Sequence, residues 1–216
     1  MLTTSDQRSQ LVNLFQQGTK LQYDKGEFVI RPGGTPPGVF YIVSGLVKAY
    51  DITKYGEENL LIIRKAEELL GLTWAITGEN RQIIYATLAP TVLLQISRER
   101  FNQFVRTNPE AALPLVDMVV DMYKLHSERI LNLEYRTVRE RLISFLLTFA
   151  KRFGKPTPQG TLIDVPIRHQ DIASSISATR ETTGREISAL ERLGLLESAH
   201  LHITLKDTEK LKSYLE

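Results

Sequence analysis

The change of hydrophobic period at Ser97 limits most strongly what this chain can fold into. From Leu21 to Ile96, short apolar, β-rich pieces such as VFYIVS, LVKAYDI and VLLQIS alternate with glycine-containing turn signals. From Ser97 to about Phe153 the apolar residues recur instead at helical spacing. Many short strands at this spacing are typical of antiparallel rolls and sandwiches. The sequence therefore predicts an α+β protein with an N-terminal antiparallel β-roll of the jelly-roll kind, followed by helices.

Helices are expected on both sides of the roll. Residues 5–17 are amphipathic, with Ser5 or Asp6 able to cap the helix, and residues 98–106 form a short helix that ends near Asn108 and Pro109. A much longer helical segment follows, and its apolar positions repeat every seven residues. The two series are Val116, Tyr123, Ile130 and Thr137, and Val119, His126 and Leu133.

A repeat of seven residues is typical of a coiled-coil seam, so this segment is predicted to be the dimerisation helix of a homodimer. The seam is expected to contain Val116, Val119, Tyr123, His126, Ile130 and Leu133. The alternative is a helix that is buried on its own β-roll.

The C-terminal part has the pattern of a winged helix-turn-helix. A helix over RERLISFLLTFAKRF leads into the loop GKPTPQG and a short strand around residues 162–165. Two short helices then follow, RHQDIASSIS and the stretch from Ser177 to Gly194, and a hairpin LLESAHLHITLK comes after them. Two helices joined by so brief a turn predict this motif. The expected domains are residues 1–108 for the sensor roll, 109–136 for the dimerisation helix and 137–216 for the DNA-binding unit.

The second of these helices carries Arg180, Glu181 and Arg185 on one polar face near its start. In a helix-turn-helix, these positions meet base edges in the major groove. Arginine can donate twice to guanine and glutamate can accept from cytosine, so the three residues are the candidate base-reading set. The alternative is a solvated helix in which Glu181 and Arg185 form an i,i+4 ion pair. The candidate phosphate contacts are His169, Gln170, Thr179 and Thr182.

Composition excludes several kinds of chemistry. The chain contains no cysteine, which rules out disulfides, cysteine-ligated iron–sulfur clusters and thiolate-bound haem. Its four histidines all lie outside the β-roll region, which argues against a histidine-ligated metal there. A formal charge of +2 permits DNA binding without requiring it. The first residues, MLTTSDQRSQLVNLF, lack the basic start and apolar core typical of a signal peptide, and no long apolar run follows, so we expect a cytoplasmic protein without a membrane partner.

Three stretches resemble the cAMP receptor protein/FNR superfamily of bacterial transcription regulators. YDKGEFVIRPGGTPPGVFYIVSGLVKAY resembles the first half of the family's sensor roll, SRERFNQFVRTNPE the short helix after it, and RHQDIASSISATRETTGREISALERLGLL the DNA-binding unit. The resemblance implies a cyclic-nucleotide-binding-like roll and a homodimer on double-stranded DNA. It also implies a pseudo-palindromic site with TGTGA-like half-sites, and RNA polymerase as a partner. The chain departs from the family at Ser177 and in the hairpin SAHLHI, where the family usually has glycine.

The resemblance also bears on the effector. The cyclic-nucleotide branch uses a Glu and a Ser where this chain has Leu72 and Gln82, and only Gly71 and Arg81 remain of that set. Because an apolar leucine leaves ribose hydroxyls unpaired, cAMP is disfavoured. SERILNLE instead resembles the nitrogen-control branch, whose effector is 2-oxoglutarate.

That resemblance assigns Arg129 and Glu134 to effector contacts. Gly71, Leu72 and Thr73 could add backbone N–H groups, and Arg81 a second cation. Alternatively, Arg129 and Glu134 only flank the dimer seam as ion pairs. No cofactor is required in either case.

Three other functions stay open at the level of sequence. The protein could be a constitutive regulator without a ligand, or a ligand-binding module that regulates a partner protein. An enzyme is the third alternative, but no nucleophile–base or metal constellation in the sequence supports one.

Overall fold

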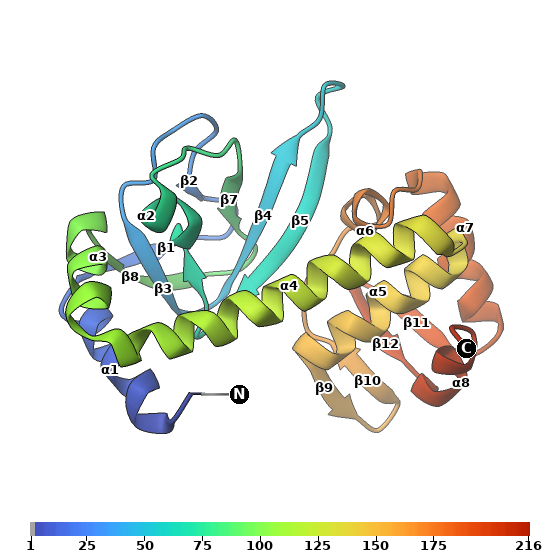
Figure 1. The fold of residues 1–216 in the computed structure, drawn as a ribbon. Coiled ribbons are helices and arrows are strands. Elements are labelled where there is room, and N and C mark those ends of the chain that lie inside the picture. The colour runs from blue at the N-terminus through green and yellow to red at the C-terminus, as the bar shows by residue number, and fades with distance from the viewer. Residues whose placement is uncertain (1–2) are drawn as a thin grey trace. The chain divides into compact units, whose positions relative to one another are not determined.

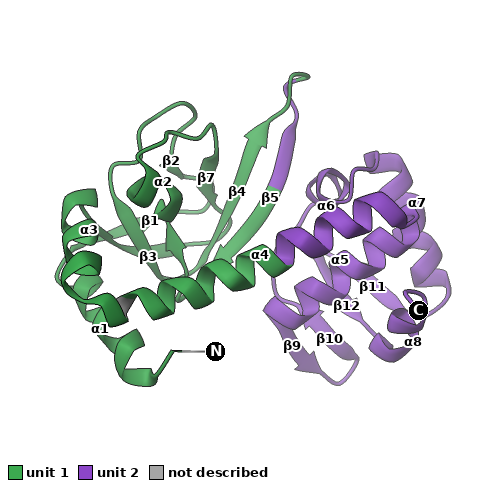
Figure 2. Cartoon of the chain, in the orientation of Figure 1, with its two compact units in different colours: residues 1–55, 61–124 green, residues 56–60, 125–216 purple. Residues whose placement is uncertain are grey.

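The computed structural model describes residues 3–216, which divide into two compact units (Figure 2). The first unit extends to Tyr55 and resumes over Leu61–Lys124, and the second joins Gly56–Leu60 to Leu125–Glu216. The long helix α4 (Ala112–Tyr135) contributes residues to both units. Within residues 3–216, no helix is both long and apolar enough to cross a membrane.

Two four-stranded sheets form the first unit (Figure 1), in the orders β1-β8-β3-β6 and β2-β7-β4-β5. The pairs β1–β8, β2–β7, β3–β6, β3–β8 and β4–β7 are antiparallel, which confirms the predicted roll. The strands are β1 (Thr19–Tyr23), β2 (Phe28–Ile30), β3 (Val39–Ser44), β4 (Leu46–Ile52), β5 (Glu58–Lys65), β6 (Leu69–Leu70), β7 (Ile84–Thr87) and β8 (Thr91–Ile96). Three features were not anticipated: the start of β1 ahead of Leu21, a short helix α2 (Leu72–Thr77) and a single 3-10 turn η1 (Pro109–Ala111).

Burial on both faces explains why the sequence of strand β3 is apolar almost throughout. Phe40 and Ile42 are fully buried in a cluster that fills the roll, whereas Val39 and Tyr41 belong to a second cluster with helices α1 (Ser5–Gln16) and α3 (Arg98–Thr107). A strand buried on both faces loses the usual alternation of apolar and polar residues. The helices α1 and α3 therefore close one side of the roll.

Two helix ends differ from the prediction. Helix α1 is capped by Thr4, which forms a capping box with Gln7, and not by Ser5 or Asp6. Thr137, which continued the heptad series, lies outside α4 and caps α5 (Val138–Phe153), where its side chain accepts from the Glu140 N–H. A capping threonine has extended backbone, which ends the seven-residue repeat inside α4.

The second unit has the predicted winged helix-turn-helix. Its remaining elements are β9 (Gly154–Thr157), β10 (Gly160–Ile163), α6 (His169–Ser175), α7 (Arg180–Arg192), β11 (Leu196–Ala199), β12 (His202–Leu205) and α8 (Thr208–Ser213). The sheet order is β11-β12-β10-β9. The expected loop GKPTPQG is in fact a hairpin, because β9 pairs with β10 from Gly154 onward, and the strand expected at 162–165 ends at Ile163.

Both glycine-free turns keep a left-handed backbone. Ser177, between α6 and α7, has φ 50°, and at the wing tip His200 has φ 49° and Leu201 has φ 67°. Side chains bearing a Cβ are disfavoured in this region by roughly 1–2 kcal/mol per residue. The departures from glycine therefore leave the turns formed but under strain.

Replacing Ser177 with glycine should relieve part of this strain. We expect Ser177→Gly to raise the free energy of unfolding by about 0.5–1 kcal/mol, because glycine adopts positive φ without steric cost. The gain is limited because glycine loses more backbone entropy than serine when the protein folds. Ser188→Gly, at an exposed site inside α7, should lower it by a similar amount. Urea denaturation of the two variants measures both effects, and a destabilised Ser177→Gly would contradict the interpretation.

Candidate nucleic-acid interface and effector site

One face of α7 is sealed into the second unit. Thr183, Ile187 and Leu190 are 0–1% exposed on that face. At the start of the helix, the Thr179 hydroxyl accepts a hydrogen bond from the Thr182 N–H at 3.1 Å. The helix begins at Arg180, as the capping residue dictates. The rotation of α7 about its own axis is thus determined by its buried face.

The candidate base-reading residues Arg180, Glu181 and Arg185 are all exposed. The alternative i,i+4 ion pair is not formed: within residues 3–216 no salt bridge joins Glu181 to Arg185, and the Arg185 Nη2 donates to the Thr182 hydroxyl at 3.1 Å. The carboxylate of Glu181 and both guanidinium groups therefore remain on the solvent side of the helix.

A second restraint on α7 was missed at the level of sequence. Glu186 Oε2 accepts from Arg139 Nε of α5 at 2.6 Å, and this hydrogen bond, with the negative charge of Glu186, raises the pKa of Arg139. The pair ties the flank of α7 to α5, next to the exposed Arg185. Its two partners are 47 residues apart in the chain, so no local pattern reveals it.

The candidate phosphate contacts occupy the start of α6 and the start of α7. His169 and Gln170 are half-buried at the first positions of α6. A Cβ placed on Gly184 of α7 would lie 3.9 Å from His169 Nδ1, so the two helices approach each other there. The Thr182 hydroxyl accepts from both Thr179 and Arg185, at 3.0 and 3.1 Å, and is therefore already engaged in ordering the first turn.

The predicted seam of α4 presents apolar side chains to solvent. Tyr123 is 71% exposed, Ile130 56%, Val119 49% and Val116 43%. His126 and Leu133 are half-buried. Leu115 packs into the core of the first unit, but the seam residues after it do not become fully buried. Isolated exposed apolar side chains are common in monomers, whereas a row of them along one helix is typical of an interface.

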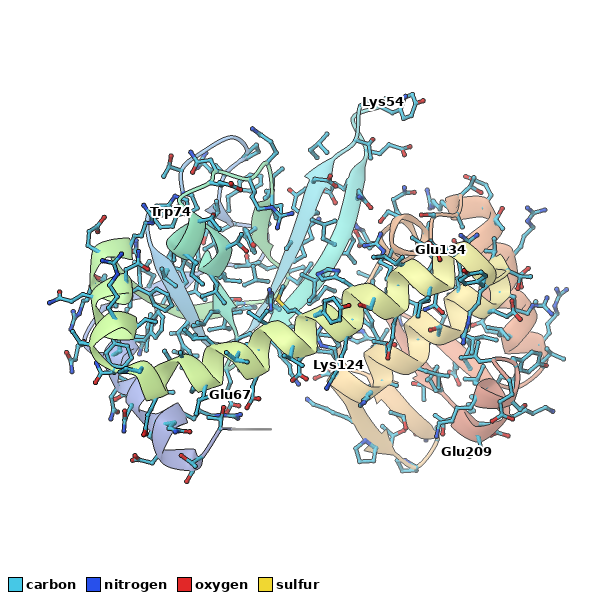
Figure 3. The ribbon with its side chains drawn as sticks, in the orientation of Figure 1. Lys54, Glu67, Trp74, Lys124, Glu134 and Glu209 are labelled. Carbon is cyan, nitrogen blue, oxygen red and sulfur yellow. The ribbon has the colours of Figure 1, made fainter. Side chains whose placement is uncertain are left out.

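Three of the effector residues predicted in the first unit, Gly71, Leu72 and Thr73, lie at the start of α2. Gly71 is the N-cap of α2 with φ 80°, and an added Cβ would lie 2.9 Å from the Gly38 carbonyl oxygen. Only glycine fits this position without movement. Leu72 and Thr73 form the first turn of α2, in which the Leu72 side chain packs against the core, and Arg81 is exposed. Figure 3 labels Trp74 on this short helix.

Arg64 and Tyr85 extend this set and were not predicted. The Arg64 side chain is 12% exposed, lies 3.3 Å from Glu68 and donates to the Met122 sulfur, while its Nε is buried without a hydrogen-bond partner. Burial raises the pKa of Tyr85, and the charges of Arg64 and Arg81 oppose that rise. Two cations therefore act on one half-buried phenol. The only sequence signal is an arginine at the end of the apolar run NLLIIR.

The remaining effector candidates, Arg129 and Glu134, belong to the second unit. Arg129 donates to the carbonyl oxygens of Leu60 and Ser174 at 3.2 and 3.3 Å. Glu134 is exposed near the end of α4 (Figure 3). Neither forms a salt bridge with the other. Among residues 3–216, no group of three or more histidine, aspartate or glutamate side chains is placed to hold a metal ion.

Comparison with known proteins agrees with this architecture. Residues 140–214 match the Crp-like helix-turn-helix domain, and residues 20–108 match the cyclic nucleotide-binding domain. The chain is 27% identical over 185 residues to the Global nitrogen regulator of Synechocystis sp., an alignment that covers 85% of this chain and 82% of that protein.

Two solved structures share the fold. A CooA mutant from Carboxydothermus hydrogenoformans matches with a TM-score of 0.77 and 24% identity, over 94% of this chain and 90% of that one. FixK2 from Bradyrhizobium japonicum matches with a TM-score of 0.78 and 21% identity, over 91% of this chain and 96% of that one.

Proposed function

Because the chain belongs to the Crp/Fnr superfamily of transcription regulators, whose members bind DNA and act as dimers, we propose that it binds a pseudo-palindromic, TGTGA-like site as a homodimer. One observation carries the proposal: Arg180, Glu181 and Arg185 are exposed at the start of a helix whose opposite face is buried. The proposed contacts are guanine O6 and N7 for the arginines and cytosine N4 for Glu181. RNA polymerase is the proposed protein partner.

Two copies are needed because one helix covers only half of a palindrome. Two-fold symmetry would place the two recognition helices about 34 Å apart, in successive major grooves. The row of Val116, Val119, Tyr123 and Ile130 supports α4 as the contact between protomers, since burying these side chains removes apolar surface from water. His126 and Leu133 complete the proposed seam.

The proposed effector is a dicarboxylate of the 2-oxoglutarate type, bound through Arg81 in the first unit. Gly71, Leu72 and Thr73 would add backbone N–H groups to its carboxylates, and Arg64 would add a further positive charge nearby. The resemblance of SERILNLE to the nitrogen-control branch supports this class of ligand, and Arg129 and Glu134 of the second unit remain separate candidates from that resemblance. In this proposal, binding shifts the population between two arrangements of the dimer that differ in their fit to DNA.

Arg185→Ala tests the base-reading assignment. Loss of a bidentate contact with guanine should weaken binding to a TGTGA-type palindrome by about 1–3 kcal/mol, roughly 5- to 150-fold, and leave binding to a scrambled duplex little changed. Arg192→Ala removes an equal charge from the last turn of α7 and serves as the control. Fluorescence anisotropy with both duplexes across a salt series measures the difference. Equal losses on the two duplexes would reject the assignment.

Ile130→Lys tests the dimer seam, with Leu131→Lys as its matched control. The two side chains are neighbours on α4 and each is 56% exposed, but only Ile130 lies in the heptad series. A buried lysine pair at Ile130 should dissociate the dimer, whereas lysine at Leu131 should not. Light scattering after size-exclusion chromatography gives the mass of each variant. Identical masses for the two variants would argue against this seam.

Ligand titration tests the effector. We expect 2-oxoglutarate to change the affinity for the palindrome by 5-fold or more, in the usual range of coupling energies of about 1–3 kcal/mol, and cAMP to have no effect. Arg81→Met should abolish the response, while Lys54→Met, at the exposed turn between β4 and β5 (Figure 3), should preserve it. Absence of any response in the wild type would favour the constitutive regulator.

A further inference from the structure

Arg168 is the residue immediately before α6, and its side chain forms hydrogen bonds with Asp171 of that helix. Its Nε donates to Asp171 Oδ2 at 2.8 Å and its Nη2 to Asp171 Oδ1 at 2.7 Å, so the guanidinium and carboxylate form a two-point fork. The Asp171 side chain is only 8% exposed, whereas that of Arg168 is 50% exposed. One edge of the guanidinium is therefore fixed against α6 and the other is presented outward.

The outward edge already holds an anion. Arg168 Nη2 also donates to Glu58 Oε2 at 2.5 Å, across 110 positions of sequence. Glu58 belongs to Gly56–Leu60, the short segment of the second unit that precedes the bulk of β5 (Figure 2). The carboxylate of Glu58 is partly sheltered, at 32% exposure.

Backbone contacts hold this segment on α6. The Leu60 N–H donates to Ser174 Oγ at 3.1 Å, and the Leu60 carbonyl accepts from Ser175 Oγ at 3.3 Å and from Arg129 Nη1 at 3.2 Å. Leu60 is 2% exposed. Glu58 is thus placed on Arg168 by an ordered segment, in contrast to surface ion pairs formed by two unrestrained side chains.

The site lies beside the candidate phosphate contacts. Arg168 is the residue before His169 and Gln170, and His169 approaches α7 at Gly184. A planar guanidinium fixed along one edge is suited to bind a phosphate oxygen with its other edge. The hydrogen bond to Asp171, followed by that to Glu58, raises the pKa of Arg168, which therefore stays charged at every working pH.

We propose that Arg168 is a DNA phosphate contact and that Glu58 occupies the place of that phosphate in the free protein. DNA binding then exchanges one anion for another on the same guanidinium, while Asp171 keeps the group oriented in both states. The inference rests on the proposed function as a DNA-binding regulator. It assigns Glu58 the role of an intramolecular competitor that lowers affinity for any duplex.

The competitor is covalently continuous with the sensor. Glu58 is the first residue of β5, and the residues of that strand from Leu61 onward belong to the first unit. The Arg168 site is therefore linked through the chain itself to the region that matches the cyclic nucleotide-binding domain.

Anisotropy with the palindrome and with the scrambled duplex tests the exchange on three variants. Glu58→Gln should tighten binding to both duplexes by about 2- to 5-fold, the range expected for one partly exposed ion pair. Arg168→Gln should weaken binding to both and reduce the magnitude of the salt slope by about 0.9, the value for one lost phosphate contact. In the double variant, Glu58→Gln should have no further effect, because its target is absent.

Glu57→Gln is the matched control, since it removes the same charge from the neighbouring, exposed position. An effect of Glu58→Gln no larger than that of Glu57→Gln, or one that persists without Arg168, would overturn the inference. So would an unchanged salt slope in Arg168→Gln, provided that its circular dichroism melting curve shows a folded protein. Failure of the proposed function appears in a different place, as equal binding of the wild type to both duplexes. No binding to either duplex would reject both.

Discussion

Burial of Thr183, Ile187 and Leu190 is the constraint on which the rest of the DNA-binding unit depends. A helix of 13 residues with a sealed face has one rotation available, and that rotation decides which residues reach the solvent. The Arg139–Glu186 pair supports the same rotation from the flank. A partly exposed ion pair contributes at most about 1 kcal/mol to stability, less than one fully buried leucine. Packing of the buried face therefore determines the rotation of α7, and the ion pair makes a smaller contribution to it. The exposure of Arg180, Glu181 and Arg185 is a consequence of what their neighbours bury.

Arginines in this protein have different roles because they have different neighbours. Arg64 is nearly buried and shares its surroundings with Arg81 and Tyr85, so its charge acts in a poorly hydrated part of the sensor. Arg168 is fixed by a buried aspartate and presents one edge to an anion. Arg180 and Arg185 remain hydrated, which suits groups that must bind DNA reversibly. Residue type alone does not distinguish these cases, because solvation and the nearest carboxylate set the energy of each charge.

The strained turns and the segment Gly56–Leu60 have a common feature: local preference yields to tertiary contacts. Ser177, His200 and Leu201 adopt left-handed conformations that their side chains disfavour. The hydrogen bonds and packing of the flanking helices and strands must offset that cost. At Leu60, too, tertiary contacts add to local structure, because its backbone N–H and carbonyl form hydrogen bonds with side chains of α6 and α4. Such sites are sensitive to substitution, and here they lie beside the proposed DNA contacts and the proposed competitor.

Sequence alone determined the elements whose signals are local. The short strands of the roll, the polar face near the start of α7 and the heptad residues of α4 all follow from residue patterns within a few positions. It did not predict α2, the β9–β10 hairpin or the cap that ends the heptad at Thr137, because short apolar or proline-containing stretches fit more than one structure. Nor did it reveal the Glu58–Arg168 pair, the burial of Arg64 or the Arg139–Glu186 restraint. Those contacts join residues far apart in the chain, and only the folded backbone brings their charges within hydrogen-bonding distance.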